Sequence, residues 1–203
     1  DYNLGNLWHT STSGLRGVEI GTNTIVFQDA NIGTKGRAVV DANNIVYAFG
    51  SDDQIYAVTA AGILWNTTVT DGSGSTMVVG KDSEYILSIN SEGVLYKYDV
   101  TNGKETKVYD FETTVSNALM TDANGVIYVG DDDGTFWALN DDGTVLWTFD
   151  AGSAITARPV MDKNGVIYIY TADNVLYALG FNKENSTISL EVNDTTTVEG
   201  LKS

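Results

Sequence analysis

The stretch MTDANGVIYVGDDDGTFWALNDDGTVLW, residues 120–147, decides the fold. Short apolar segments alternate in it with turns made of Asp, Asn and Gly. Asn-Gly and Asp-Gly pairs supply the positive backbone φ of tight hairpins. No 12-residue window of the chain has the three-and-four apolar spacing of an amphipathic helix. The stretch therefore predicts antiparallel strands joined by hairpin turns.

The same pattern recurs along the chain. The segments 37–47, 117–128 and 158–168 share an apolar strand, a turn of the Asp-x-Asn-Gly type and a second apolar strand, and a looser copy lies between the first two. Four equivalent positions, 40, 41 and 40 residues apart, are held by Tyr47, Leu87, Tyr128 and Tyr168. Four short antiparallel strands every ~40 residues are the signature of a β-propeller blade.

We expect an all-β propeller over residues 1–182, with about four full repeats and a partial one. The repeats are placed near 37–76, 77–116, 117–157 and 158–182. Residues 18–28 resemble the first two strands of a further blade. Three arrangements fit this count: a small closed ring of about four or five blades, part of a longer propeller, or two copies that complete one eight-bladed ring.

The two ends of the chain predict different structures. Residues 6–10 resemble residues 63–67, an outer strand, and we expect them to supply the missing outer strand of the last blade, because propellers close in this way to avoid an open edge. Residues 183–203 change character and alternate like a half-exposed strand. They are expected to be a linker and the start of an Ig-like module, or else a peripheral strand of the propeller.

The repeat, best seen in residues 120–147, resembles that of pyrroloquinoline-quinone-type (PQQ-like) propellers. The resemblance covers residues 37–180 well. It implies a propeller that serves as a binding platform, since the same repeat occurs in quinoprotein dehydrogenases and in non-enzymatic relatives. It also implies that residues 99–104 form the turn on which an outer strand docks. No catalytic constellation of a quinoprotein accompanies the repeat.

Aromatic residues recur with the period of the blades. Both faces of a blade are covered by its neighbours, so the layers between blades need large apolar side chains. An aromatic cage for a cation or a sugar is the alternative. The expected blade anchors are Trp8, Trp65, Trp147, Tyr128, Tyr168 and Tyr177.

Composition excludes several classes of function. The chain has 203 residues, 27 of them acidic and 11 basic, for a formal charge of −16, so it would repel nucleic acids. No apolar run approaches the roughly 18 residues of a membrane-spanning helix, and no membrane insertion is expected. The absence of cysteine excludes disulfides and thiolate chemistry. The single histidine, His9, is expected to be an exposed strand residue rather than a catalyst.

Asp131, Asp132 and Asp133 are the best candidates for a metal site, because clustered carboxylates beside a glycine suit calcium. The spacing does not fit an EF-hand, and the alternative is that such residues simply form hairpin turns. No other cofactor is expected. Arg37, Lys81 and Arg158 lie near the starts of repeats, where they either face a ligand at the channel mouth or pair with turn aspartates.

The sequence thus predicts a binding or scaffold module of a secreted or cell-surface protein, with no enzymatic activity. A protein or saccharide ligand and a homodimer that completes a larger propeller are the expected partners. The alternatives are an enzyme or cofactor carrier, either quinoprotein-like or carbohydrate-active, and a structural spacer in a surface array.

Overall fold

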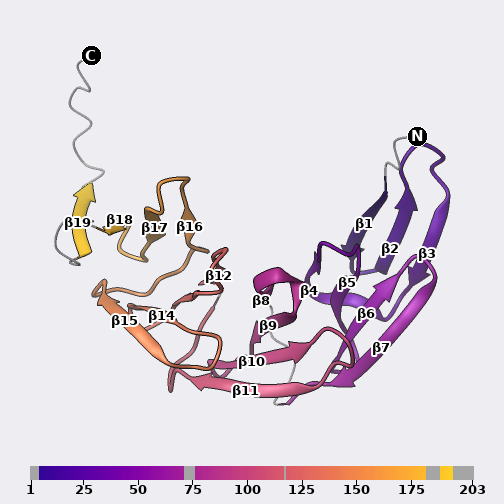
Figure 1. The fold of residues 1–203 in the computed structure, drawn as a ribbon, viewed down its shortest axis with the longest axis horizontal. Coiled ribbons are helices and arrows are strands. Elements are labelled where there is room, and N and C mark those ends of the chain that lie inside the picture. Colours follow the sequence, from indigo (N-terminus) through magenta and orange to yellow (C-terminus); the bar gives the residue numbers. More distant parts are fainter. Residues whose placement is uncertain (1–4, 71–75, 117, 182–187, 194–203) are drawn as a thin grey trace. The chain divides into compact units, whose positions relative to one another are not determined.

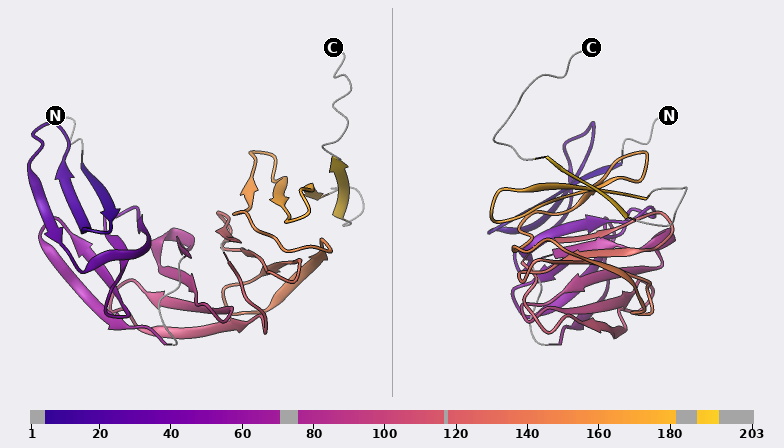
Figure 2. Two further views of the ribbon diagram at one scale, coloured as in Figure 1. Left: turned by 180° about the vertical axis from the view of Figure 1, so that it is seen from behind. Right: turned by 90° about the vertical axis from the view of Figure 1, so that its left-hand side faces the viewer.

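The structure, a computed structural model, describes residues 5–70, 76–116, 118–181 and 188–193. In this part of the chain the elements are β-strands and one three-residue 3-10 turn, η1 (Lys81–Ser83). The chain divides into two compact units, an N-terminal unit (Asp1–Glu112 with Thr121–Gly125) and a C-terminal unit (Thr113–Met120 with Val126–Ser203). Neighbouring strands in every sheet are consecutive along the chain (Figures 1 and 2).

The N-terminal unit contains three antiparallel sheets. The first sheet is β1 (Asn6–Ser11), β2 (Gly14–Glu19) and β3 (Ile25–Asp29). The second sheet is β4 (Ile32–Val40), β5 (Val46–Gly50), β6 (Gln54–Thr59) and β7 (Gly62–Thr68). The third sheet is β8 (Thr76–Val79), β9 (Tyr85–Ile89), β10 (Val94–Asp99) and β11 (Glu105–Asp110).

The C-terminal unit contains two antiparallel sheets. The last residue of its first strand, Thr121, belongs to the N-terminal unit. The fourth sheet is β12 (Ala118–Thr121), β13 (Ile127–Gly130), β14 (Thr135–Leu139) and β15 (Val145–Asp150). The fifth sheet is β16 (Val160–Met161), β17 (Ile167–Tyr170), β18 (Leu176–Phe181) and β19 (Ile188–Asn193). The expected all-β architecture of four-stranded antiparallel sheets is confirmed.

Aspartates start the hairpins that follow the first strand of three sheets. The Oδ1 atoms of Asp41, Asp122 and Asp162 each accept the backbone N–H two residues later, at 2.8 to 2.9 Å. The residues with positive φ in these turns are Asn44, Gly125 and Gly165. A side chain that satisfies the turn's N–H groups, together with a residue that tolerates the left-handed conformation, fixes a tight hairpin. The Asp-x-Asn-Gly motif is thus the local cause of the strand pairing.

Three sheets share one side-chain arrangement across their strands. A small residue on one strand lies directly between two aromatic residues on the neighbouring strands. The centroids of the two aromatic rings are 5.9 to 6.0 Å apart. The three sets are Trp8, Gly17 and Phe27; Tyr47, Ala57 and Trp65; and Tyr128, Ala138 and Trp147. A Cβ on Gly17 would come within 2.7 Å of the Trp8 ring, so the small residue is what lets the rings approach.

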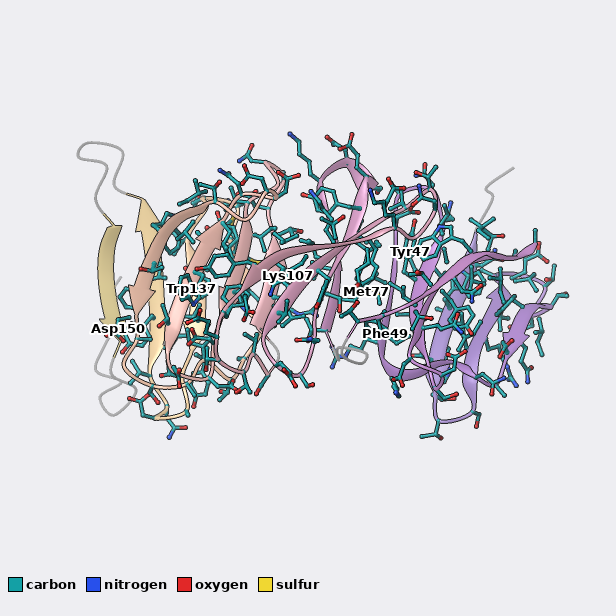
Figure 3. All side chains as sticks on the ribbon, turned by 90° about the horizontal axis from the view of Figure 1, so that it is seen from below. Tyr47, Phe49, Met77, Lys107, Trp137 and Asp150 are labelled. Carbon is teal, nitrogen blue, oxygen red and sulfur yellow. The ribbon has the colours of Figure 1, made fainter. Side chains whose placement is uncertain are left out.

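The sheets of each unit pack face to face through apolar layers. In the N-terminal unit, Tyr47 and Phe49 of the second sheet form one buried cluster with Met77 of the third sheet (Figure 3). The other face of the second sheet forms a cluster with Leu15 of the first. In the C-terminal unit, Phe136 of the fourth sheet belongs to the layer shared with the fifth. Both faces of the second sheet are therefore apolar, as the sequence predicts for a sheet that lies between two neighbours.

Trp65 ties the second sheet to the third. Its indole N–H donates to the carbonyl oxygen of Val100 at 2.7 Å, and a Cβ on Gly103 would lie 2.6 Å from its ring. The close approach therefore requires glycine at position 103, where φ is +71°. Residues 99–104 are the docking turn that the resemblance implies.

The structure differs from the sequence-based prediction at residues 6–10. These residues belong to β1, which pairs with β2, and they do not form the outer strand of the fifth sheet. The register places Trp8 opposite Gly17, as Tyr47 lies opposite Ala57, so Trp8 corresponds to a second strand rather than to Trp65. The first sheet therefore holds the second, third and fourth strands of a blade. Residues 18–28 provide its last two strands rather than its first two.

The outer strand of the fifth sheet is β19. It pairs with β18 from the Phe181–Ile188 pair to the Leu176–Asn193 pair. The alternating segment after residue 183 thus completes a propeller sheet over residues 188–193. This is the peripheral strand of the propeller that the sequence predicts as the alternative to an Ig-like module. An exposed edge of β18 explains the difference, because its unpaired N–H and C=O groups gain partners from β19. The other residues of 183–203 lie outside the described residues.

Candidate functional site

The carboxylate of Asp131 is buried and holds a hairpin. Its Oδ1 accepts the backbone N–H of Thr135 at 2.7 Å, and its Oδ2 accepts the indole N–H of Trp137 at 2.8 Å. Both oxygens are thus satisfied by the fourth sheet itself.

Asp132 faces a different set of groups. Its Oδ2 accepts the hydroxyls of Thr114 at 2.6 Å and Ser116 at 2.8 Å. Asp133 is exposed. Among the described residues no group of three His, Asp or Glu side chains is placed to hold a metal ion. The structure therefore does not bring the three carboxylates together: Asp131 and Asp132 accept hydrogen bonds from different groups, and Asp133 is exposed.

Three tyrosines donate hydrogen bonds to carboxylates. Tyr47 donates to Asp41 at 3.1 Å, Tyr56 to Asp52 at 2.6 Å, and Tyr98 to Glu105 at 3.0 Å, all within the N-terminal unit. Burial, reinforced by Asp52, raises the pKa of Tyr56 to about 12. Burial and the neighbouring carboxylates also raise the pKa of Tyr47 and of Tyr98. These hydroxyls remain protonated donors that tie strands to turns.

The three cations singled out in the sequence are exposed, and they do not occupy one kind of position. Arg37 and Arg158 are equivalent, because each lies two residues before a valine that pairs with a tyrosine of the next strand. Lys81 lies in η1, between the first two strands of the third sheet. None of the three forms an ion pair with another described residue.

The expected blade anchors lie in or beside the layers between sheets. Trp65 packs in the layer of the second and third sheets, and Trp8 in that of the first and second. Tyr128, Trp147 and Tyr177 belong to the layer of the fourth and fifth sheets. Tyr168 is half-buried and alternates with Ile167 and Ile169 along β17, so it lies on the opposite face of the fifth sheet.

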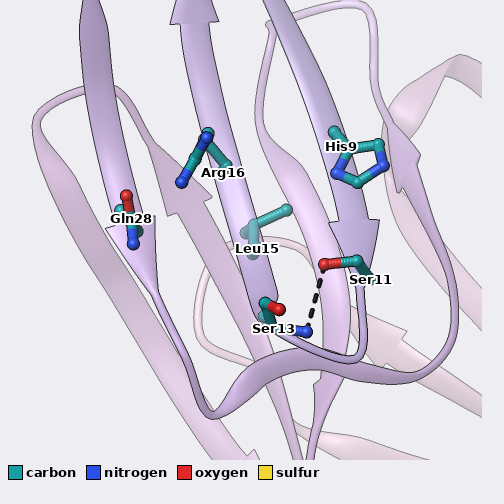
Figure 4. A pocket seen from close by; sticks show the side chains of 7 residues that line it. His9, Ser11, Ser13, Leu15, Arg16 and Gln28 are labelled. Atoms are coloured by element: carbon teal, nitrogen blue, oxygen red, sulfur yellow. Dashed lines mark hydrogen bonds between the residues drawn. The ribbon is translucent and has the colours of Figure 1, made fainter.

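A pocket of about 200 Å³ lies on the exposed face of the first sheet, where the sequence predicted no site. Its polar walls come from neighbouring strands: His9 pairs in register with Arg16, and Arg16 with Gln28 (Figure 4). Ser11 and Ser13 close one end, and the Ser13 N–H donates to the Ser11 hydroxyl oxygen at 3.1 Å. The walls offer guanidinium, hydroxyl and amide donors, which suit an anionic group. This pocket is the candidate site.

A sequence signal for this pocket exists in the distribution of charge. Only one of the 27 acidic residues, Glu19, lies between residues 5 and 28, so this stretch is nearly neutral in a strongly acidic chain. The sequence does not group His9 with Arg16 and Gln28, because these residues become its neighbours only through strand pairing. His9 is exposed, as expected.

No helix in the described ranges has the length and apolar character that would be needed to cross a lipid bilayer.

Residues 106–196 match the model of a family described as outer membrane protein assembly factor BamB. These repeats are PQQ-like. The match spans the fourth and fifth sheets. It includes residues 120–147, whose repeat resembles that of PQQ-like propellers. No curated protein matches the sequence.

Several solved β-propellers share the fold of this chain. BamB from Moraxella catarrhalis superposes with a TM-score of 0.69 at 18% identity, over 86% of this chain and 54% of that one. The computationally designed Ika8 protein superposes with a TM-score of 0.73 at 16% identity, over 94% of this chain and 59% of that one. The WD40 β-propeller domain of Doa1 superposes with a TM-score of 0.65 at 14% identity, over 94% of this chain and 66% of that one. The chain therefore spans between about half and two thirds of the length of these propellers, and its fold class is that of the β-propellers.

Proposed function

We propose that the chain is a non-catalytic binding module that holds a protein partner on the hairpin loops and exposed faces of its sheets. The observation that carries the proposal is the match of residues 106–196 to the model of an assembly factor. Rigid sheets that present exposed loops are a common basis for binding sites.

The use of polar groups within the sheets supports this role. Asp41, Asp131 and Glu105 accept hydrogen bonds from nearby backbone or side-chain donors, so each holds a turn or a strand in place. In the proposed function they stabilise the platform, and the ligand contacts come from exposed residues. No resident cofactor is part of the proposal, and calcium is tested below.

We place the module at a cell surface or in a secreted protein. The description of the matching family as an outer membrane assembly factor and the absence of cysteine support this location. A homodimer is part of the proposal, since the chain spans little more than half the length of the BamB structure. A saccharide is the second class of ligand to be tested.

A site-specific cross-linking experiment tests the proposal. A photoreactive residue at Lys163, in the exposed hairpin of the fifth sheet, is compared with one at Thr148, which is exposed on the outer strand of the fourth sheet. We expect a cross-linked partner from Lys163 and not from Thr148, and the purified partner should then bind the 203-residue chain directly. Cross-linking of equal yield from both positions would contradict a loop-mediated contact.

Native mass spectrometry of the same chain separates the alternatives. A dimer without added mass, in calcium and in chelator, agrees with the proposal, and a monomer without added mass would remove the homodimer from it. A calcium-dependent or quinone adduct would contradict it in favour of a cofactor carrier. Binding of oligosaccharide with turnover would indicate a carbohydrate-active propeller, and lateral assembly without a partner would indicate a spacer.

A further inference from the structure

The exposed face of the first sheet is polar at positions that are mostly apolar elsewhere. At the position of Arg16 in β2, each of the other four sheets has an aromatic residue: Tyr56, Tyr96, Trp137 and Tyr177. His9, opposite Arg16, takes the place of Ala48, Ser88, Val129 and Ile169. Covering an unpaired guanidinium with an apolar sheet face would be costly. The part of this face around Arg16 and His9 therefore suits a polar occupant, and Leu7, further along β1 on the same face, is 62% exposed.

The same sheet has an edge that can take another strand. The N–H of Ile20 donates to the carbonyl oxygen of Gly5 at 3.1 Å, and hydrogen-bonded pairs alternate along an antiparallel ladder. The backbone groups of Asn6, Trp8 and Thr10 therefore point away from β2. No other described residue forms a backbone hydrogen bond with these groups. In the second sheet this edge is occupied by β4.

The charge around the pocket favours an anion. Arg16 forms no ion pair with another described residue. The two nearest acidic residues of the sheet are engaged elsewhere: Glu19 accepts the hydroxyl of Thr22, and Asp29 accepts the backbone N–H of Asn31 at 2.8 Å. Arg16 is therefore available to a carboxylate from outside, with His9 and Gln28 as further donors.

A strand that adds to β1 would place one side chain directly beside His9 on the pocket face, because cross-strand neighbours lie about 5 Å apart. Arg16 is one strand further away, so a glutamate can reach it better than the shorter aspartate. A second copy that added its own β1 would instead bring two Arg16 guanidinium groups onto one face, where like charges repel. The geometry thus favours a different, acidic strand.

We propose that the first sheet binds an extended acidic segment of a partner protein, which adds to β1 as an antiparallel strand and places a glutamate carboxylate over His9 and Arg16. The proposal rests on the proposed function, because it names the kind of partner that the module holds. Main-chain hydrogen bonds would supply affinity, and the pocket would supply selectivity.

Fluorescence anisotropy with the 203-residue chain tests this. The probe is a labelled eight-residue peptide of alternating Thr and Val with one central Glu, compared with its Gln and Lys versions. We expect the Glu peptide to bind about fivefold more tightly than the Gln peptide, as for an exposed ion pair of about 1 kcal/mol. The Arg16→Gln variant should abolish that difference and leave binding of the Gln peptide unchanged. Arg37→Gln, on the second sheet, is the matched control and should retain the difference.

Backbone methylation of the peptide tests strand addition without changing the protein. Methyl groups on the amides of one edge of the strand should abolish binding, whereas methyl groups on the opposite edge should be tolerated. Equal binding of the Glu and Gln peptides, or indifference to methylation of either edge, would overturn the proposal. A dimer that Arg16→Gln dissociates would also overturn it, in favour of a second copy. Cross-linking from Lys163 is independent of this sheet, so its success alongside such a failure would leave the proposed function intact.

Discussion

The first and second sheets share one architecture and use it differently. Each places a small residue between two aromatic rings on the face that packs toward the following sheet. On the other face, Val46 of the second sheet is fully buried, whereas Leu7, at the equivalent position of the first sheet, is 62% exposed. The repeat therefore fixes how a sheet is built, and the presence of a neighbour decides whether a face becomes core or surface.

The largest expected effect is the loss of a ring from the second sheet. Tyr47→Ala removes a fully buried side chain and should lower the free energy of unfolding of the N-terminal unit by about 3–5 kcal/mol. Urea denaturation with hydrogen exchange as a local probe measures it. Trp8→Ala in the half-buried first sheet should cost less. Tyr47→Phe, which removes only the hydrogen bond to Asp41, should cost about 1 kcal/mol. Equal losses for Tyr47→Ala and Trp8→Ala would remove the distinction between the sheets.

The next largest effect on stability is expected at Gly17, the small residue between two rings in the first sheet. Gly17→Ala places a methyl group 2.7 Å from the Trp8 ring and should destabilise by about 1–2 kcal/mol, after the gain from replacing glycine in a strand is subtracted. Differential scanning calorimetry measures the change, and the fluorescence of Trp8 should shift. Ala57→Gly in the second sheet is the comparison and should cost about 0.5–1 kcal/mol. A stabilised Gly17→Ala variant would show that the ring moves aside freely.

Titration of Tyr56 should distinguish the sheets at high pH. Its folded pKa of about 12 lies above the ordinary value of 10, so its contribution to stability is complete below pH 10 and is lost as the pH rises toward 12. Tyr56→Phe should cost about 1 kcal/mol at pH 9, and this difference from the unsubstituted chain should shrink by pH 11.5. The urea midpoints at the two pH values measure it. Arg16 occupies the same position in the first sheet, so that sheet has no tyrosine to make this contribution. A difference that stays constant with pH would show that burial and Asp52 do not raise the pKa of Tyr56 in the folded chain.

The smallest effect concerns the exposed face. Leu7→Ser should change the free energy of unfolding by no more than about 0.5 kcal/mol, because the side chain is already mostly in water. Val46→Ser, at the equivalent buried position, should cost several times more. Chemical denaturation of the two variants in parallel gives the ratio. A large loss from Leu7→Ser would mean that this face is covered in solution.

The repeating part of the fold could be predicted from the sequence because its causes are local. Aspartates such as Asp162 satisfy the N–H groups of their own hairpins, and the apolar runs have the length of single strands. The period of about 40 residues then fixes which strands are equivalent.

Which strands of a blade the first sheet contains could not be predicted in the same way. The segment around Trp8 resembles the one around Trp65 over a few residues, yet second and fourth strands both carry an aromatic residue toward the same face. Only the pairing of Trp8 with Gly17 distinguishes them, and pairing is a property of the folded chain. The partner of β19 was likewise decided by an available edge, which the alternation of its residues does not reveal.

The candidate site was hidden for the same reason. Its walls come from three strands, and His9, Arg16 and Gln28 become a group only in the register of the sheet. The acidic run at residues 131–133 was visible in the sequence, but the directions of its side chains within the turn were not.

The hydrogen bond from Trp65 to Val100 has a consequence for synthesis of the chain. The donor lies 35 residues before its acceptor, so the outer strand of the second sheet leaves the ribosome before its anchor exists. At typical elongation rates that interval lasts about 2–7 seconds. During it, the Trp65 ring lies on a strand whose neighbour in the sheet is β6, without the contact to Val100. Pausing of translation between residues 65 and 103 would therefore extend the period in which a chaperone can reach this strand.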